Sequence, residues 1–183
     1  MSGTGRLATR RVYSGRVISV DVDTVRFPDG STGDLEMVRH PGASAVVPFL
    51  DEPGRDDARV LLIRQYRYAA GGHVYEIPAG RLDEGEDPEH CARRELREET
   101  GYSCSALTRL TTFHTTPGFT DERIHMFMAT GLSEGLSSPE ADEILEIHPV
   151  PFKRALEMTR SGEIVDGKTM VGLFLAESRF LAG

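Results

Sequence analysis

The sequence predicts an α+β or α/β sandwich, in which strands and helices pack against one another. Three observations support this prediction. Before Gly80 the chain consists mainly of short segments that are apolar or alternate apolar and polar residues, which is the pattern of β-strands. A well-delimited helix follows, and after further strand-like segments two helical segments end the chain. The order strands, helix, strands, helix, helix differs from the regular alternation of a doubly wound fold.

Length and composition are those of one globular domain with a small appendage. The chain has 183 residues, of which 39% are hydrophobic and 27% are charged, and these values are close to globular averages. The longest apolar runs, 45–50 and 60–63, are far too short to span a bilayer. Nothing at the N-terminus has the pattern of a secretory signal. We therefore expect a cytoplasmic protein without a membrane partner.

The net charge limits the classes of partner. At a net charge of −8 the chain offers no stripe of Lys and Arg that could release counterions from a nucleic acid, so no nucleic-acid partner is expected. Chemistry on a phosphate group would need a metal ion in such an acidic protein. Cys91 and Cys104 are the only cysteines, and they lack the paired spacing of zinc or disulfide sites.

The N-terminal segment predicts a small antiparallel β unit over residues 1–41. The expected elements are polar, mobile residues 1–10, an alternating strand over 12–27, a turn at 28–30 and a second strand over 32–39. A break at 40–42 then marks the start of a main domain over 42–183. A β unit this small needs cover, either from the main domain or from a second copy of the chain.

The main domain is predicted to place strands before and after one central helix. The expected strands are 45–50, 59–67, 74–78, 105–115, 123–130 and 144–150, and the expected closing helices are 151–160 and 168–181. Pro48 indicates a sheet edge or a bulge in the first of these strands, because proline cannot donate a backbone hydrogen bond.

The central helix has clear boundaries in the sequence. Asp87 is a suitable N-cap, Pro88 suits the first helical position, and Gly101 suits the position after the last turn. These boundaries give about 13 helical residues. The residues expected to dock on the sheet are Ala92 and Leu96, and those expected in solvent are Arg93 and Arg97.

Three carboxylates crowd one face of this helix. Glu95, Glu98 and Glu99 stand at i, i+3 and i+4, so they are neighbours on the helix surface and repel one another. A hard divalent cation turns this repulsion into a binding site, because Mg²⁺ takes carboxylate oxygens and keeps positions for water and a substrate phosphate. A solvated helix face is the alternative interpretation. Arg94 borders the cluster, where it could hold a carboxylate in place.

The same stretch resembles the Nudix box of Nudix hydrolases. The matching positions are Gly80, Glu86, Arg94-Glu95-Leu96, Glu98-Glu99 and Gly101. Tyr102 stands where the box usually has an aliphatic residue, which is a mild departure. So many specified positions in one short stretch make a chance match improbable. The resemblance implies the Nudix fold, with its mixed sheet between helices, and a hydrolase that acts on a pyrophosphate.

Motifs outside the box resemble the ADP-ribose pyrophosphatase subfamily. They lie at 64–67, 75–80 and 116–122, and the last of them contains Pro117 at the distance from the box that is usual in that subfamily. The N-terminal strands resemble the subfamily's dimer-forming domain, which implies a homodimer. The implied activity is cleavage of ADP-ribose to AMP and ribose 5-phosphate. Another nucleoside diphosphate derivative, such as a nucleotide sugar, and a non-catalytic nucleotide-sensing module are the alternatives.

Carried over position by position, the resemblance assigns roles to residues of the box. Glu95 and Glu99 would be the principal ligands of two or three Mg²⁺ or Mn²⁺ ions. Glu98 and the Ala79 carbonyl would complete the metal site. Arg94 would orient the carboxylates, and we expect Arg94 and Glu98 to take part in catalysis.

Further roles fall outside the box. Glu143 matches best the position of a base or additional metal ligand in a late acidic loop, and Glu140 and Asp142 are its rivals because loop length shifts the register. A merely soluble loop is the alternative. Arg67 and Glu76 match positions that touch the substrate, although Arg67 could instead be a charge at a strand edge in water.

Overall fold

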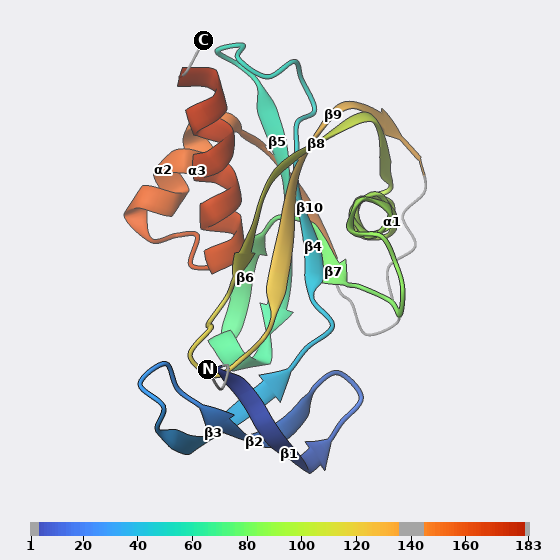
Figure 1. Cartoon of the computed structure of the whole chain (residues 1–183). Helices are drawn as coiled ribbons and strands as arrows, with labels where there is room; N and C mark the ends of the chain where they lie inside the picture. The colour runs from blue at the N-terminus through green and yellow to red at the C-terminus, as the bar shows by residue number, and fades with distance from the viewer. Residues whose placement is uncertain (1–3, 136–144, 182–183) are drawn as a thin grey trace. The chain divides into compact units, whose positions relative to one another are not determined.

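The computed structural model describes residues 4–135 and 145–181, and contacts between Cα atoms divide the chain into two compact units (Figure 1). The first unit comprises residues 1–42 and 113–123, and the second comprises 43–112 and 124–183. The boundary predicted from the sequence lies one residue earlier, and that prediction did not include 113–123 in the N-terminal unit. That 1–41 and 42–183 act as separate domains stays a prediction.

The first unit contains a three-stranded antiparallel sheet in the order β1-β2-β3. Its strands are β1 (Gly5–Ser14), β2 (Ser19–Arg26) and β3 (Thr32–Arg39). The predicted strand over 32–39 is confirmed. The prediction of one strand over 12–27 is wrong, because the chain reverses where the Gly15 N–H donates to the Ile18 carbonyl (2.9 Å). Residues 5–10, expected to be mobile, belong to strand β1. β1 is exposed along its whole length, so no buried face imposed an alternating pattern on its first half.

The loop 113–123 joins this unit through hydrogen bonds to β3. The Val38 N–H donates to the Phe119 carbonyl (2.8 Å). The Arg39 guanidinium donates to the Asp121 carboxylate (3.1 Å). These contacts are long-range in sequence, and for this reason the predicted boundary missed them.

The second unit contains two sheets, ordered β10-β5-β6 and β7-β4-β9-β8. Their strands are β4 (Ala43–Pro48), β5 (Arg59–Arg67), β6 (Gly72–Glu76), β7 (Ala79–Arg81), β8 (Tyr102–His114), β9 (Arg123–Glu134) and β10 (Leu145–Pro151). β4 pairs in parallel with β9 and antiparallel with β7, so this sheet is mixed, as predicted. The prediction of a sheet edge or bulge at Pro48 is wrong, because β4 is an inner strand paired in regular register and Pro48 is its last residue.

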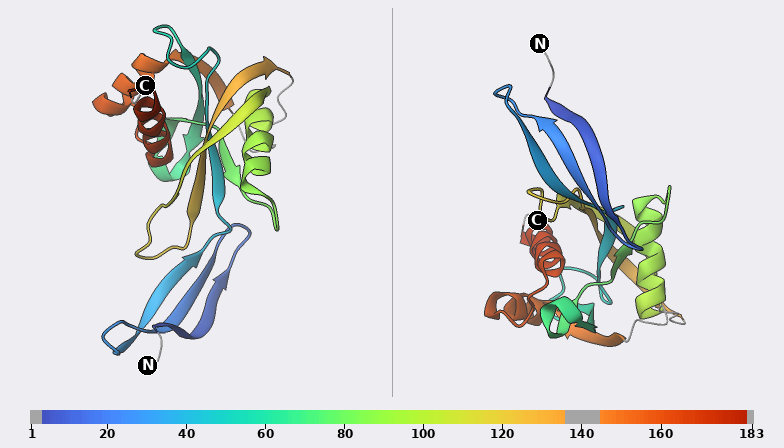
Figure 2. Two further views of the ribbon diagram at one scale, coloured as in Figure 1. Left: turned by 45° about the horizontal axis from the view of Figure 1, so that its top comes forward. Right: turned by 90° about the horizontal axis from the view of Figure 1, so that it is seen from below.

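Helices cover the strands of the second unit from two sides (Figures 1 and 2). They are α1 (Pro88–Thr100), α2 (Phe152–Ser161) and α3 (Gly167–Leu181), and a short 3-10 helix spans Tyr68–Ala70. α1 packs on β4 and β7, and α3 packs on β4 and β6 from the other side. The predicted α/β/α sandwich of the α+β class is thereby confirmed. Within the described ranges, no helix is long and apolar enough to cross a membrane.

Candidate active site

Helix α1 begins and ends where the sequence predicts. The Asp87 carboxylate accepts hydrogen bonds from the N–H groups of Glu89 (2.9 Å) and His90 (3.3 Å), which otherwise have no partner within the helix. Gly101 takes φ = 78° after the last turn, a left-handed conformation that glycine adopts without strain. The N-cap and the glycine therefore fix the length of the helix, and with it the position of its acidic face.

The apolar side of α1 holds the helix against the sheet. Ala92 and Leu96 are fully buried, as predicted, and pack in one cluster with Val46 of β4. Burial of a leucine side chain is worth about 1.5–3 kcal/mol. Arg97 is exposed, as predicted. The prediction for Arg93 holds only in part, because 38% of its side chain is exposed and its guanidinium also donates to the Cys104 carbonyl (3.1 Å).

The glutamates on the neighbouring face of α1 point at the start of β7. Glu95 is 8% exposed and Glu99 is 2% exposed. The Ala79 N–H donates to the Glu99 carboxylate (3.0 Å). A Cβ atom added to Gly80 would lie only 1.9 Å from the Glu95 carboxylate, so that carboxylate lies directly against the Gly80 backbone. Two buried carboxylates thus converge on Ala79 and Gly80, which brings both principal predicted metal ligands, Glu95 and Glu99, to the backbone at Ala79.

Strand β4 holds both partners of this contact. β7 pairs with β4 in antiparallel register, with Ala79 opposite Ala45 and Gly80 opposite Ser44. The Ser44 hydroxyl donates to the carbonyl of Pro88 (2.7 Å), the first residue of α1. The same strand therefore sets the position of the backbone at β7 and of the helix that carries the glutamates.

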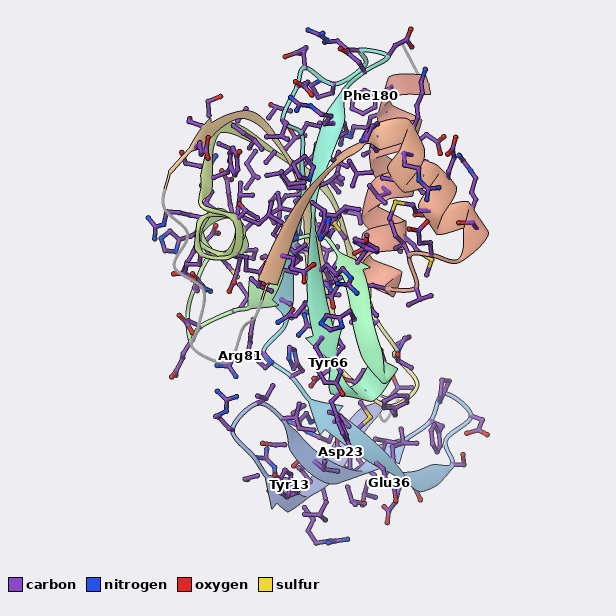
Figure 3. All side chains as sticks on the ribbon, turned by 180° about the vertical axis from the view of Figure 1, so that it is seen from behind. Tyr13, Asp23, Glu36, Tyr66, Arg81 and Phe180 are labelled. Atoms are coloured by element: carbon purple, nitrogen blue, oxygen red, sulfur yellow. The ribbon has the colours of Figure 1, made fainter. Side chains whose placement is uncertain are left out.

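Arg94 connects the carboxylates of the box. Its guanidinium donates to Glu86 (two contacts of 2.9 Å), to Glu95 (2.6 Å) and to Glu98 (3.1 Å). A further bond reaches the carbonyl of Arg81 (3.1 Å), the residue that ends β7 and is labelled in Figure 3. These contacts agree with the orienting role that the resemblance implies for Arg94, and the role itself stays a prediction.

Glu86 matches the box, but sequence reasoning assigned no role to it, and the structure pairs it with Arg94. Its side chain is buried, and the hydrogen bonds from Arg94 lower the pKa of Glu86 to about 2. The surrounding carboxylates in turn raise the pKa of Arg94, the hydrogen bond to Glu86 being the strongest influence. Because Glu86 stays ionised, it holds Arg94 in place beside the glutamates of α1.

The donor set at this face fits a hard divalent cation. Carboxylate and carbonyl oxygens are the ligands that Mg²⁺ and Mn²⁺ prefer, and Mg²⁺ sites usually combine one or two carboxylates with waters and substrate phosphates. Glu95, Glu99 and the Ala79 carbonyl supply such oxygens. Glu98 is less buried and is held by Arg94. In the part of the chain that the structure describes, no three His, Cys, Asp or Glu side chains gather closely enough to bind a metal on their own, so water and phosphate would have to complete the site.

Arg67 and Glu76 form a second ion pair, of which only the carboxylate is buried. The Arg67 guanidinium donates two parallel hydrogen bonds to Glu76 (2.6 and 2.8 Å). Glu76 is 2% exposed, whereas 43% of the Arg67 side chain is exposed. Burial raises the pKa of Glu76, but the bonds from Arg67 and the charge of Lys168 outweigh it, so the pKa lies below its ordinary value. Arg67 therefore has a carboxylate partner and is not simply a solvated charge at a strand edge. Its role in substrate binding stays a prediction.

Lys168 is the residue at this pair that sequence reasoning missed. Its ammonium binds the Glu76 carboxylate from the first turn of α3. The sequence contained a signal for it, because a cation in the first turn of a helix is disfavoured by the helix dipole and needs a specific partner.

The three acidic residues considered for the catalytic base, Glu140, Asp142 and Glu143, lie outside the described residues. The structure therefore gives no geometry for the base. Its assignment stays a prediction.

The depressed pKa of Glu86 predicts how stability depends on pH. A carboxylate whose pKa falls from 4.5 to about 2 on folding stabilises the protein fully above pH 4.5, and this contribution disappears as the pH falls towards 2. The free energy of unfolding of the wild type minus that of Glu86→Gln should therefore be constant above pH 4.5 and shrink at lower pH. Urea denaturation across this range measures it. Glu52→Gln, which alters an exposed loop carboxylate, should give a difference that is small at every pH.

Comparison with known proteins places this geometry in a family. A family model described as the NUDIX domain matches residues 39–168. This chain belongs to the Nudix family. The Nudix box of this chain thus comprises β7, the loop after it and α1, and this Nudix hydrolase has the fold that its sequence predicts.

Individual relatives agree with the family assignment. The chain is 41% identical over 165 residues to the ADP-ribose pyrophosphatase of Bacillus subtilis (strain 168), covering 89% of this chain and 86% of that one. It is 40% identical over 169 residues to the methanol dehydrogenase activator of Bacillus methanolicus, covering 91% and 89%. A solved structure titled "Crystal structure of ADP compounds hydrolase" covers 100% of this chain and 96% of that chain with a TM-score of 0.81 and 22% identity. At this identity the structural likeness supports the fold alone.

Proposed function

We propose that this Nudix hydrolase cleaves the pyrophosphate of ADP-ribose to give AMP and ribose 5-phosphate. The observation that carries the proposal is the convergence of the Glu95 and Glu99 carboxylates on Ala79 and Gly80. A relative that is 41% identical over most of both chains is named an ADP-ribose pyrophosphatase, which supports ADP-ribose as the substrate.

We further propose a role for each residue of the site. Glu95, Glu99 and the Ala79 carbonyl hold two or three Mg²⁺ or Mn²⁺ ions, with Glu98 beside them. When bound, such ions neutralise charge that develops on the pyrophosphate and lower the pKa of a water molecule. Arg94 keeps the carboxylates oriented through the bonds described above.

Residues outside the box complete the proposed reaction. Arg67 binds the substrate, since a planar guanidinium matches phosphate oxygens in two-point contacts. Glu76 holds Arg67 in the required orientation. Glu143 accepts the proton of the attacking water. If Glu143→Gln keeps the full kcat, the role passes to Glu140 or Asp142.

The activity is tested by product analysis with the purified chain. With Mg²⁺ and ADP-ribose, release of AMP and ribose 5-phosphate is expected, and EDTA should stop it. A panel of nucleotide sugars and other nucleoside diphosphate derivatives is assayed in parallel. A higher kcat/KM for a nucleotide sugar would replace ADP-ribose by that substrate class. Tight binding of ADP-ribose without turnover would instead indicate a nucleotide-sensing module.

We propose that the N-terminal unit forms a homodimer interface. Every residue of β1 is exposed, including the apolar Leu7, Val12 and Tyr13. Tyr13 is labelled in Figure 3. A three-stranded sheet that exposes this much apolar surface normally packs against another surface.

If the N-terminal unit forms the dimer interface, a mutation in β1 should lower the molar mass of the protein in solution. Val12→Asp places a charge on the exposed strand and should shift the protein from dimer to monomer in light scattering. Val165→Asp alters another exposed valine, in the second unit, and should leave the mass unchanged. A wild type that is monomeric at micromolar concentration would contradict the proposal. A cytoplasmic location and the absence of a nucleic-acid partner stay predictions.

A further inference from the structure

The first turn of α3 contacts the end of β6, from which the chain leads into the candidate metal site. The Lys168 ammonium binds the Glu76 carboxylate and also Asp166 (3.1 Å). The Thr169 hydroxyl accepts a hydrogen bond from the Ile77 N–H (2.9 Å) and donates to Asp166 (2.6 Å). Two segments that are far apart in the sequence thus share one connected group of hydrogen bonds.

These bonds hold the first turn of α3, and with it Lys168, in a fixed position relative to the candidate site. Thr169 and Ile77 are both fully buried, so breaking their bond would leave a buried N–H without a partner, at a cost of about 1–3 kcal/mol. Two residues beyond Ile77, the Ala79 N–H is held by Glu99 (3.0 Å). The short segment 77–79 is therefore hydrogen-bonded to the residue after Lys168 at one end and to a proposed metal ligand at the other.

The charges at this point balance only when Lys168 is present. Arg67 and Lys168 supply two positive charges, and Glu76 and Asp166 supply two negative ones. Glu76 is 2% and Lys168 is 14% exposed, so water screens these charges weakly. Without Lys168 the group would carry an excess negative charge, which repels a pyrophosphate.

Lys168 also constrains the geometry of Arg67. Both Glu76 oxygens accept from one edge of the Arg67 guanidinium, and one of them also accepts from Lys168. The outer edge of the guanidinium belongs to a half-exposed side chain. The direction in which Arg67 presents that edge depends on where the Glu76 carboxylate is held.

We propose that Lys168 is a positioning residue for substrate binding. Its ammonium fixes and neutralises Glu76, and Arg67 can then present its outer edge to the pyrophosphate of a nucleoside diphosphate derivative. The proposal rests on the proposed function for the substrate class, but it concerns binding and does not require hydrolysis.

The test compares three variants of the full chain. Lys168→Met removes the charge and keeps the side-chain length, and Lys168→Arg keeps the charge. Lys153→Met makes the same change at an exposed lysine of α2 that pairs with Asp56. The dissociation constant of ADP-ribose is measured by calorimetry in EDTA, where turnover does not interfere. Lys168→Met should bind about tenfold more weakly than the wild type, as the loss of one weakly screened charge implies.

The controls separate positioning from general destabilisation. Lys168→Arg should recover most of the affinity, and Lys153→Met should bind like the wild type. Loss of a buried partner of Glu76 should lower the Tm of Lys168→Met, but all variants should remain folded at the temperature of the binding assay. In turnover assays Lys168→Met should raise KM, with kcat and the Mg²⁺ concentration for half-maximal rate within about twofold of the wild type, because only substrate binding changes. Unchanged affinity in Lys168→Met, or equal loss in Lys153→Met, would overturn the proposal.

The outcome is independent of whether the chain hydrolyses ADP-ribose. A wild type that binds ADP-ribose without releasing AMP would refute the proposed function, and the ratio of dissociation constants would still decide the role of Lys168. If the substrate panel favours a nucleotide sugar, the same ratio is expected with that ligand, and its absence would refute the role of Lys168 alone.

Discussion

Replacement of Glu99 by glutamine is expected to lower kcat/KM for ADP-ribose by about three orders of magnitude, since a lost metal ligand removes several kcal/mol of transition-state stabilisation. The amide oxygen of glutamine can still accept the bond from the Ala79 N–H, so the fold should remain intact. The measurement is initial-rate kinetics with Mg²⁺ together with Tm. A low rate at an unchanged Tm would separate loss of the metal site from loss of structure.

The matched control for this variant lies on the same helix. Glu89 is exposed in the first turn of α1 and pairs only with Arg93 among the described residues (3.0 Å). Glu89→Gln removes the same charge at a distance from the carboxylate pair and should change the rate by less than about twofold, since exposed ion pairs contribute little. An unaltered rate in Glu99→Gln would refute the assignment of Glu99 as a metal ligand.

Replacement of Gly80 by alanine should lower kcat/KM by about a hundredfold, the scale of loss that a misplacement of about 1 Å causes. The added methyl group would occupy the space of the Glu95 carboxylate, 1.9 Å away. Because the end of a glutamate side chain can rotate, the carboxylate moves and the backbone does not. Activity should therefore fall while Tm changes little.

Gly72→Ala is the appropriate control for the glycine variant. Gly72 begins β6, and a Cβ atom added there meets nothing within 4 Å. Both substitutions remove the same conformational freedom from the unfolded chain, so only the clash with Glu95 distinguishes them. Equal activities of the two variants would contradict the placement of Glu95 against Gly80. A raised Mg²⁺ requirement in Gly80→Ala alone would support it.

Local chemistry made the box and its helix predictable from the sequence. The Asp87 cap, Pro88 and Gly101 define α1 through contacts within a few residues, and those contacts are present. The spacing of Glu95 and Glu99 places both on one face of any helix. Their convergence on β7 then follows because the buried Leu96 sets the rotation of the helix against the sheet.

Contacts between distant segments were not predictable in the same way. Lys168 and Glu76 are 92 residues apart in the sequence. Periodicity predicts contacts within one helix or strand and gives no information about such a pair. Apolar–polar alternation did not predict strand β1, because neither of its faces is buried. The alternating run that follows continues through the reversal at Gly15, and a pattern of alternation alone does not show where a strand turns back.

The pairing of β4 with β9 determines when the site can form during folding. β4 touches β7 and α1, but its parallel partner lies some eighty residues further along the chain, with Ala43 opposite Ile124. Closing so large a loop costs conformational entropy before the strand pairing can stabilise the chain, and such topologies fold slowly. The glutamates of α1 and the β7 backbone therefore become a site only after that closure, and recovery of catalytic activity should report completion of folding rather than formation of the helix.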